Sequence, residues 1–424
     1  MFLACAERAY TIAFTTYTQP RYEGAGGASG RRQMKYIVLR INVDSGPLKT
    51  GKGRIEPLEA LAVGSVKLGI EDIASTAYAS FLRDPGVSAV APLMPVKLIA
   101  PLAPSATGTD ANWGLQAIAA DTCPFSGRGA RIAVLDTGID ATHAAFAGVE
   151  LTQVDFTGDG NGDGNGHGTH CAGTILGRDV DGKRVGVARG VQKALIGKVL
   201  DSAGQGDSAQ LFQALMWAMQ NGAHIVSMSL GFDFPGMVAR LANQEGWPVD
   251  LATSSALEAY RANLRMFDAI MELYNAQAAF GSSPLVVAAA GNESRRDLDA
   301  SYRLAASLPS AATHVISVAA VGQALDRFSV APFSNSMATI AAPGVDIRSA
   351  QLGGGLAALS GTSMACPHVA GACALWWEAI QTRGQTPTSL LVQSQLMSTA
   401  KPDVFASDTD EQDVGAGLVQ CPLA

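Results

Sequence analysis

Gly361-Thr362-Ser363-Met364-Ala365 is the last of three glycine-flanked blocks in this chain. The two earlier blocks are Val134-Leu135-Asp136-Thr137-Gly138 and His167-Gly168-Thr169-His170. Together the blocks supply a nucleophile, an acid and a base. A serine hydroxyl is a poor nucleophile until an imidazole takes its proton, and a buried carboxylate must hold the tautomer of that imidazole. The blocks therefore predict a catalytic triad with one residue from each.

The order of the three candidates along the chain discriminates between folds. Asp136 comes first, His167 second and Ser363 last. Chymotrypsin-like enzymes run His, Asp, Ser, and α/β-hydrolases run Ser, acid, His, whereas the subtilisin order is Asp, His, Ser. Only the subtilisin order fits this chain.

A fourth block, Ala288-Ala289-Ala290-Gly291-Asn292-Glu293, lies between the candidate base and the candidate nucleophile. Acyl transfer develops negative charge on a carbonyl oxygen, and a fixed side-chain amide is a suitable hydrogen-bond donor to it. We therefore predict that Asn292 stabilises this oxyanion. With all four blocks in this order, the chain resembles the subtilisin-like serine proteases.

Each block alone has an ordinary structural explanation. Asp-Thr-Gly is a common turn after a strand, and His-Gly-Thr-His is also compatible with a metal pair or with core histidines. The serine block is more specific, because glycine, serine and the early Pro367 suit a nucleophile at the start of a helix. The conjunction of four blocks in one order favours the protease hypothesis.

Composition and charge limit the partners. The chain has 424 residues, of which 48% are hydrophobic and 16% charged, which is typical of a large globular core. The net charge of −7 and the lack of a long basic run argue against nucleic acid as a partner. No uninterrupted apolar stretch approaches about 18 residues, so no membrane span is expected.

The cysteine pattern predicts free thiols rather than a disulfide scaffold. The six cysteines have no CxxC pair and no short-spaced framework; they are Cys5, Cys123, Cys171, Cys366, Cys373 and Cys421. Cys171 and Cys366 lie in apolar helical patterns, so buried thiols are favoured for them. A cysteine nucleophile is the weaker alternative.

The first 33 residues predict an N-terminal extension, which we expect to be disordered. Glu7 and Arg8 interrupt its early apolar residues, so the stretch fits a secretory signal peptide poorly. Together with the free-thiol pattern, this favours the cytoplasm over export.

Residues 34–100 predict a compact α+β unit. It contains a strand at Lys35–Arg40, an amphipathic helical pattern at Ile73–Leu82 and an extended segment at Val87–Ile99. The unit looks like the propeptide of subtilisin-like proteases, although an unrelated small domain remains an alternative. The resemblance implies an intramolecular inhibitor and folding chaperone, with its C-terminal tail in the substrate cleft. We expect a linker at 101–112 and self-cleavage between Leu98 and Asn112.

Residues 113–424 predict the catalytic domain, with a doubly wound and mostly parallel α/β sheet. Short apolar runs predict buried parallel strands, and helical patterns at Ser208–Asn221 and Ser254–Ala279 lie between some of them. The runs are Ile132–Leu135, Ala194–Leu200, His224–Leu230, Leu285–Ala290 and Val315–Val321.

The resemblance also implies a substrate-binding surface. Ser229, Leu230 and Gly231 resemble the segment that pairs with the substrate backbone, and the stretch containing Ala289 and Gly291 resembles the opposite wall. Three arginines follow Asn292, and they indicate either a preference for acidic residues before the scissile bond or an ordinary solvated surface; they are Arg295, Arg296 and Arg303. We interpret His170 as structural support.

Two features depart from familiar secreted subtilisins. The segment 232–283 is longer than in the simplest members, which indicates restricted substrate access, a partner site or a surface elaboration. The stretch Asp155–Gly164 matches the start of a calcium loop only in part, because His170 stands where a bidentate acid is needed. We interpret this stretch as glycine-rich flexibility. Structural calcium is compatible with the resemblance, but we assign no ligands and expect no cofactor in the chemistry.

The sequence therefore favours a self-processing serine endopeptidase zymogen that acts on polypeptides. One alternative is a peptide ligase or macrocyclase of the same fold, in which an amine outcompetes water at the acyl-enzyme. A further alternative is a stably inhibited zymogen that serves as a regulatory binding module.

Overall fold

A computed structural model describes residues 34–41, 66–73, 78–103, 113–278, 283–407 and 409–423. The expected extension 1–33 and most of the expected linker 101–112 lie outside the described residues. The strands are β1 (Met34–Ile41), β2 (Val66–Ile73), β3 (Val87–Pro92), β4 (Pro95–Leu98), β5 (Arg131–Asp136), β6 (Glu150–Asp155), β7 (Lys193–Lys198), β8 (Gln205–Asp207), β9 (Ile225–Met228), β10 (Leu230–Phe232), β11 (Leu285–Ala289), β12 (Val315–Ala324), β13 (Arg327–Val330), β14 (Ile340–Pro343), β15 (Ile347–Ala350) and β16 (Leu356–Leu359). The helices are α1 (Tyr78–Phe81), α2 (Trp113–Ala117), η1 (Ala144–Phe146), α3 (His167–Leu176), α4 (Ser208–Gln220), α5 (Phe234–Ala239), η2 (Arg240–Gln244), α6 (Val249–Ala278), α7 (Thr362–Thr382), α8 (Ser389–Thr399) and α9 (Glu411–Val414).

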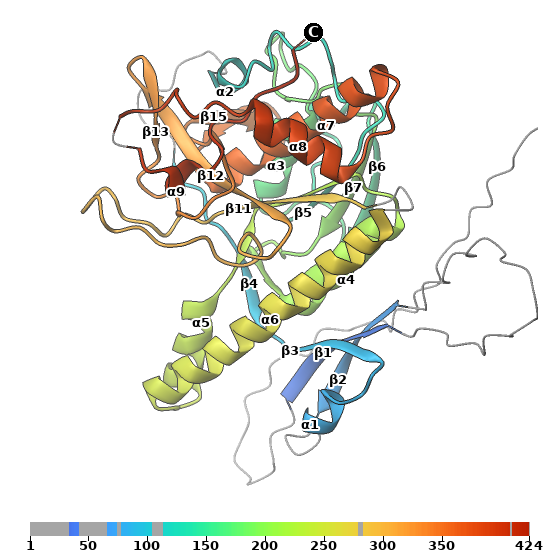
Figure 1. The fold of residues 1–424 in the computed structure, drawn as a ribbon, viewed down its shortest axis with the longest axis vertical. Helices are drawn as coiled ribbons and strands as arrows, with labels where there is room; N and C mark the ends of the chain where they lie inside the picture. Colours follow the sequence, from blue (N-terminus) through green and yellow to red (C-terminus); the bar gives the residue numbers. More distant parts are fainter. Residues whose placement is uncertain are drawn as a thin grey trace, which may run out of the picture.

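The central sheet has the order β13-β12-β11-β9-β5-β7-β6, with β14 paired to β12. All of its described pairings are parallel except that of β12 with β13. Helices α3, α7 and α8 lie on one side of the sheet, and α4 and α6 lie on the other (Figure 1). Strands such as β5 and β11 are apolar along most of their length because both faces are covered. The predicted doubly wound α/β class is confirmed.

One expected strand is divided in two. The run His224–Leu230 becomes β9, which stays in the central sheet, and β10, which pairs with β4 and leaves that sheet. Ser229 lies between the two strands, near the carboxyl end of β9. The division matters for function, because it places β10 at an edge where another strand can add.

The N-terminal unit is an antiparallel sheet with the order β2-β1-β3. Strand alternation gives it two apolar faces. Ile37 and Leu39 join an apolar cluster that contains residues of α4 and α6, whereas Tyr36 and Val38 face the side of α1. The expected helix at Ile73–Leu82 is wrong in its first part, because Ile73 ends β2 in register with Met34 and the helix is limited to Tyr78–Phe81. Strand pairing overrides the helical spacing there.

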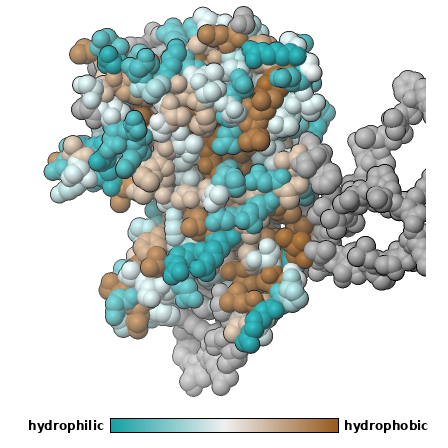
Figure 2. Space-filling model, viewed as in Figure 1, coloured by the Kyte–Doolittle hydropathy of each residue, from teal (hydrophilic) through white to brown (hydrophobic). Residues whose placement is uncertain are grey.

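The inserted segment supports the N-terminal unit. Helix α6 packs against β3, and Asn263 Nδ2 donates to the carbonyl oxygen of Pro92 at 2.9 Å. Met266, Phe267 and Ile270 are buried in the cluster that this helix shares with β1 and β2. The outward side of α6 shows teal stretches in Figure 2, whereas its N-terminal turns also expose Val249, Leu251 and Leu257. The segment is therefore more than a surface elaboration, since it forms much of the surface on which the N-terminal unit lies.

The described helices include none that is both long and apolar enough to cross a membrane. The five described cysteines are free, and all of them except Cys123 are buried. Burial raises the pKa of the Cys366 thiol to about 11. These thiols are protonated near neutral pH.

Candidate active site

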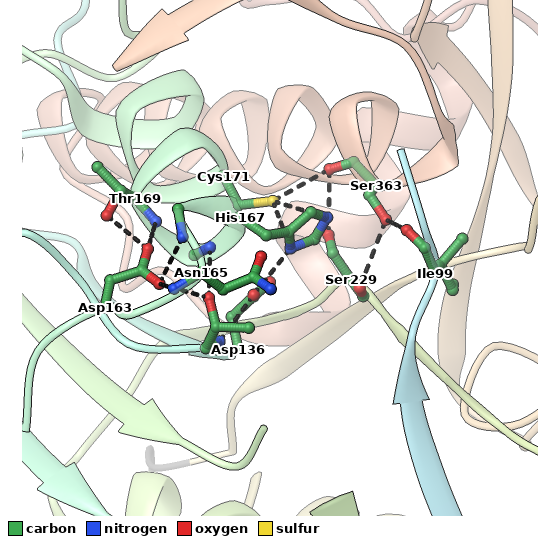
Figure 3. A network of polar contacts seen from close by, with 12 residues as sticks. Ile99, Asp136, Asp163, Asn165, His167, Thr169, Cys171, Ser229 and Ser363 are labelled. Carbon is green, nitrogen blue, oxygen red and sulfur yellow. Dashed lines mark hydrogen bonds and ion pairs between the residues drawn. The ribbon is translucent and has the colours of Figure 1, made fainter. Parts of the chain in front are cut away.

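The three candidate residues lie close together where one strand ends and two helices begin (Figure 3). Asp136 ends β5, His167 opens α3, and Ser363 lies in the first turn of α7. All three are buried, and His167 Nδ1 lies 2.8 Å from Asp136 Oδ1 (Figure 3). The backbone N–H of Thr137 also donates to Asp136 Oδ1 at 2.8 Å. The contact of His167 with Asp136 fixes Nδ1 as the protonated ring nitrogen and leaves Nε2 free to accept a proton.

Glycine allows the acid and base blocks to approach each other. Gly138 has φ of 106°, which favours glycine, and a Cβ there would collide with the carbonyl oxygen of Gly162. A Cβ at Gly168 would likewise collide with the carbonyl oxygen of Gly138. The glycines of these motifs are therefore needed for close packing between β5 and the start of α3.

Asp163 anchors the loop that leads into His167. Its Oδ1 accepts from Thr137 Oγ1 at 2.9 Å and from the backbone N–H groups of Asn165 and Gly166. Its Oδ2 accepts from the N–H and hydroxyl of Thr169, at 2.8 and 2.6 Å (Figure 3). The interpretation of this stretch as flexible is wrong at Asp163, because a buried carboxylate with five donors fixes the loop. An Asp four residues before His167, with a Thr two residues after it, was the local signal for this anchor.

We predict that Asp163→Asn lowers kcat by about tenfold to a hundredfold and leaves KM nearly unchanged. An amide keeps one acceptor oxygen but turns an NH₂ group toward existing donors, which displaces the blocks carrying Asp136 and His167. The free energy of unfolding should also fall by about 2 kcal/mol. Peptide hydrolysis and urea unfolding measure both effects. Asp155→Asn is the control, since Asp155 binds Thr157 and Gly160 in the same loop; an equal loss of kcat in both variants would contradict the prediction.

Two side chains fix the backbone carbonyl group of Ser363 by hydrogen bonds. Cys171 Sγ donates to the Ser363 carbonyl oxygen at 3.3 Å, and Ser229 Oγ donates to the same oxygen at 3.1 Å. Burial, followed by the charge of Asp136, raises the pKa of Cys171 well above its ordinary value. A protonated thiol is a poor nucleophile, which disfavours cysteine catalysis here.

The Asn292 amide is oriented by Thr362. Asn292 Oδ1 accepts from the backbone N–H and the hydroxyl of Thr362, both at 2.9 Å. Its Nδ2 therefore points away from Thr362 and donates to the carbonyl oxygen of Ala100 at 3.0 Å. This is the orientation that a donor to a developing oxyanion needs.

The chain's own segment 95–102 passes through the site. Strand β4 pairs antiparallel with β10 on one side and with β8 on the other. Beyond β4, the Ser363 hydroxyl donates to the Ile99 carbonyl oxygen at 3.3 Å, and Leu102 forms a bridge to Ser360. Strand β4 is therefore the central strand of the three-stranded sheet β10-β4-β8, and Ile99, which follows it, lies beside Ser363 (Figure 3).

Two of the predicted substrate-binding residues pair directly with this segment. Leu230 and Gly231 are in register with Leu98 and Lys97, and Ser229 contacts the Ser363 backbone. Ala289 belongs to the same apolar cluster as Ile99. The N–H of Gly291 donates to Thr362 Oγ1, which helps to position Asn292.

The three arginines after Asn292 have carboxylate partners. Arg296 pairs with Asp413 at 2.6 Å, Arg303 with Asp410 at 2.7 Å, and Arg295 with Asp297 at 3.3 Å. These contacts disfavour the hypothesis that the arginines select acidic substrates.

The other histidines near the site have structural partners. His170 Nε2 donates to the Ile347 carbonyl oxygen at 3.0 Å, and burial lowers its pKa to about 3. His368 Nδ1 donates to the Met364 carbonyl oxygen at 2.8 Å, and burial lowers its pKa to about 4. Both rings are neutral near pH 7, as suits structural histidines.

The carboxylates of the partial calcium motif have protein partners. Asp155 and Asp163 accept hydrogen bonds within their loop, and Asp159 pairs with the buried ammonium of Lys198 at 3.1 Å. In the part of the chain that the structure describes, the cluster with metal-ligand geometry is Asp136, His167 and Cys171, which is the candidate catalytic site itself. We assign no calcium ligands.

Comparisons with known proteins converge on one family. Residues 127–417 match the Subtilase family. The chain is 31% identical over 381 residues to an alkaline protease of Alkalihalobacillus alcalophilus, which covers 87% of this chain and 81% of that protein. It is 32% identical over 323 residues to subtilisin Savinase of Lederbergia lenta, which covers 74% of this chain and 97% of that protein. It is 38% identical over 258 residues to an intracellular serine protease of Paenibacillus polymyxa, which covers 59% of this chain and 67% of that protein.

Proposed function

Because this chain belongs to the subtilase family and is a subtilisin-like serine endopeptidase, we propose that Asp136, His167 and Ser363 are its catalytic triad. The observation that carries the proposal is the buried contact of 2.8 Å between Asp136 and His167, beside a serine that faces a peptide segment in extended form. The substrates are polypeptides, which bind as a strand between β10 and β8.

The reaction begins when the Ser363 hydroxyl turns from the Ile99 and Ser229 carbonyl oxygens toward His167 Nε2. His167 takes the proton as the Ser363 oxygen attacks a peptide carbonyl carbon, and Asp136 stabilises the resulting imidazolium. His167 then gives the proton to the leaving amine, and water hydrolyses the acyl-enzyme by the same route in reverse. No step requires a metal ion.

Asn292 stabilises the oxyanion, and Asn292→Ala should lower kcat by about a hundredfold to a thousandfold with little change in KM. That range is the one known for the equivalent loss in subtilisin. The donor acts on charge that is present mainly in the transition state, so binding of the substrate changes little. Steady-state kinetics with a peptide substrate measure the effect. Thr362→Val removes one of the two donors to Asn292 Oδ1 and should give a smaller loss; a larger loss than Asn292→Ala would contradict the assignment.

We also propose that the chain is made as a self-processing zymogen. The N-terminal unit lies on α4 and α6, and its C-terminal segment occupies the cleft that substrates need. An intact segment would compete with substrates as an intramolecular inhibitor. A stably inhibited regulatory module would share this arrangement but would stay uncut, whereas a ligase would differ in its products.

Labelling with a fluorophosphonate tests the proposed nucleophile directly. The purified chain is incubated with the probe, digested and mapped by peptide mass. An adduct on Ser363 supports the proposal, and peptide hydrolysis that persists while Ser363 stays unmodified contradicts it. Product masses in the presence of an added amine separate hydrolysis from ligation.

A further inference from the structure

The segment that occupies the cleft carries three kinds of information about cleavage: a carbonyl next to the nucleophile, a buried side chain just before it, and an ion pair further upstream. From these we propose that the chain cuts itself between Ile99 and Ala100, and that Asp233 selects substrates with a basic residue in the third position before the cut. The inference rests on the proposed function.

The first observation is the position of the nucleophile. The Ser363 hydroxyl donates to the Ile99 carbonyl oxygen at 3.3 Å, so the nucleophile lies beside the Ile99 carbonyl group. The next carbonyl, that of Ala100, accepts from Asn292 Nδ2 at 3.0 Å. Attack at the Ile99 carbonyl carbon requires the Asn292 Nδ2 donor to shift from the Ala100 carbonyl oxygen to the Ile99 carbonyl oxygen. We therefore expect self-cleavage to be slower than cleavage of a separate peptide that binds with its oxygen at Asn292.

The second observation is the anchor before the cut. Ile99 is only 5% exposed, and its side chain covers Gly231, where an added Cβ would lie 3.5 Å from Ile99 Cγ1. Ala100 is exposed. A buried branched side chain directly before the attacked carbonyl holds that carbonyl in place, and the Ala100 side chain does not provide such an anchor.

The chemistry of the leaving group favours the same bond. Cleavage at Ile99–Ala100 forms an ester between Ser363 Oγ and the Ile99 carbonyl carbon and breaks the bond to the Ala100 nitrogen. That nitrogen takes the proton from His167 and leaves as a primary amine; water then releases the Ile99 carboxylate. The neighbouring bond, Ala100–Pro101, has a ring nitrogen without a hydrogen and with a fixed φ, so it adapts poorly to the geometry of cleavage.

The third observation is the ion pair upstream. Lys97 Nζ lies 2.8 Å from Asp233 Oδ1, and the Asp233 N–H donates to the Pro95 carbonyl oxygen. Lys97 is in register with Gly231 on β10, so any peptide that replaces the segment in this register places its third residue before the cut beside Asp233. Asp233 also caps α5 by accepting from the Gly236 N–H, which holds its carboxylate in position.

The bond assignment is tested by the masses of both products. The full-length wild-type chain is incubated beside its Ser363→Ala variant, with and without a fluorophosphonate. We expect one fragment that ends at Ile99 and a complementary fragment that begins at Ala100, in wild type only. Complementary masses separate the first cut from later trimming of the ends. Ile99→Asp should slow the cut by about a hundredfold or more, because it places a charge in an apolar site.

The role of Asp233 is tested with peptides based on residues 96–102 on the processed enzyme. We expect Lys in the third position to give kcat/KM about three- to fivefold higher than Glu, since the ion pair is partly exposed. Asp233→Asn keeps an acceptor oxygen for the α5 cap and should bring this ratio close to one. Asp297→Asn, a matched change in an exposed pair with Arg295, should leave the ratio unchanged.

The outcomes distinguish the inference from the function on which it rests. A fragment that begins at Pro101 or later without a complementary one ending at Ile99, or a chain that labels on Ser363 but stays full-length, overturns the bond assignment and leaves the serine protease standing. A Lys/Glu ratio that survives Asp233→Asn overturns the role of Asp233. A wild-type chain that neither labels nor hydrolyses any peptide contradicts the proposed function as well.

Discussion

Ser363→Ala should reduce peptide hydrolysis by about a millionfold, the scale known for loss of the serine in subtilisin. Without the hydroxyl no acyl-enzyme forms, and the remaining activity comes only from the binding of substrate and the oxyanion donor. The fold should stay intact, because the hydrogen bonds of the hydroxyl within the described residues are with two backbone oxygens, at 3.3 and 3.4 Å. Initial rates with a fluorogenic peptide, beside an unfolding curve, measure both quantities.

The matched control for Ser363→Ala is Ser229→Ala. This hydroxyl donates to the Ser363 carbonyl oxygen and lies in the same site, but it has no covalent role in the proposed mechanism. We expect a loss of no more than about tenfold from its altered positioning. Substantial hydrolysis by the Ser363→Ala variant, free of contaminating wild type, would rule out Ser363 as the nucleophile.

Asp136→Asn should lower kcat by about ten-thousandfold, the scale of this change in Ser-His-Asp enzymes. The amide cannot stabilise the imidazolium, and its NH₂ group favours the ring tautomer in which Nδ1 accepts and Nε2 carries the proton. In that tautomer Nε2 cannot take the proton of Ser363. The affinity for substrate should change little, because Asp136 is buried behind His167 and lies outside the strand-binding surface.

Asp140→Asn provides the comparison for Asp136→Asn. Asp140 lies four residues further along, where it accepts from Thr142 and from the Gly353 backbone. We expect kcat within about twofold of wild type for this variant. If the two substitutions lowered kcat equally, a general effect on this loop would replace the proposed role of Asp136.

The candidate triad could be identified from sequence because each member lies in a short contiguous motif. The glycines, the strand that ends at Asp136 and the helix starts at His167 and Ser363 are local features, and their order along the chain selects one fold. The parallel sheet was equally accessible, since strands covered on both faces are uniformly apolar.

The helical expectation at Ile73–Leu82 shows the limit of local patterns. Ile73, Ala77 and Phe81 have helical spacing, yet Ile73 pairs with Met34 at the end of a strand. The free energy of this eight-residue strand pairing depends on residues 34–41, and the partner of Ile73 lies 39 positions earlier in the chain (73 − 34), outside any short window.

By itself, the sequence determined the fold class, the family and the candidate acid, base, nucleophile and oxyanion donor in their short motifs. Only the tertiary structure decided that Asp163 anchors the loop before His167, that the inserted helix packs against the N-terminal unit, and that segment 95–102 passes Ser363 with Lys97 beside Asp233. The reason is physical. Motif chemistry acts over a few neighbouring residues, whereas strand register and side-chain pairing are set by contacts between segments far apart in the chain.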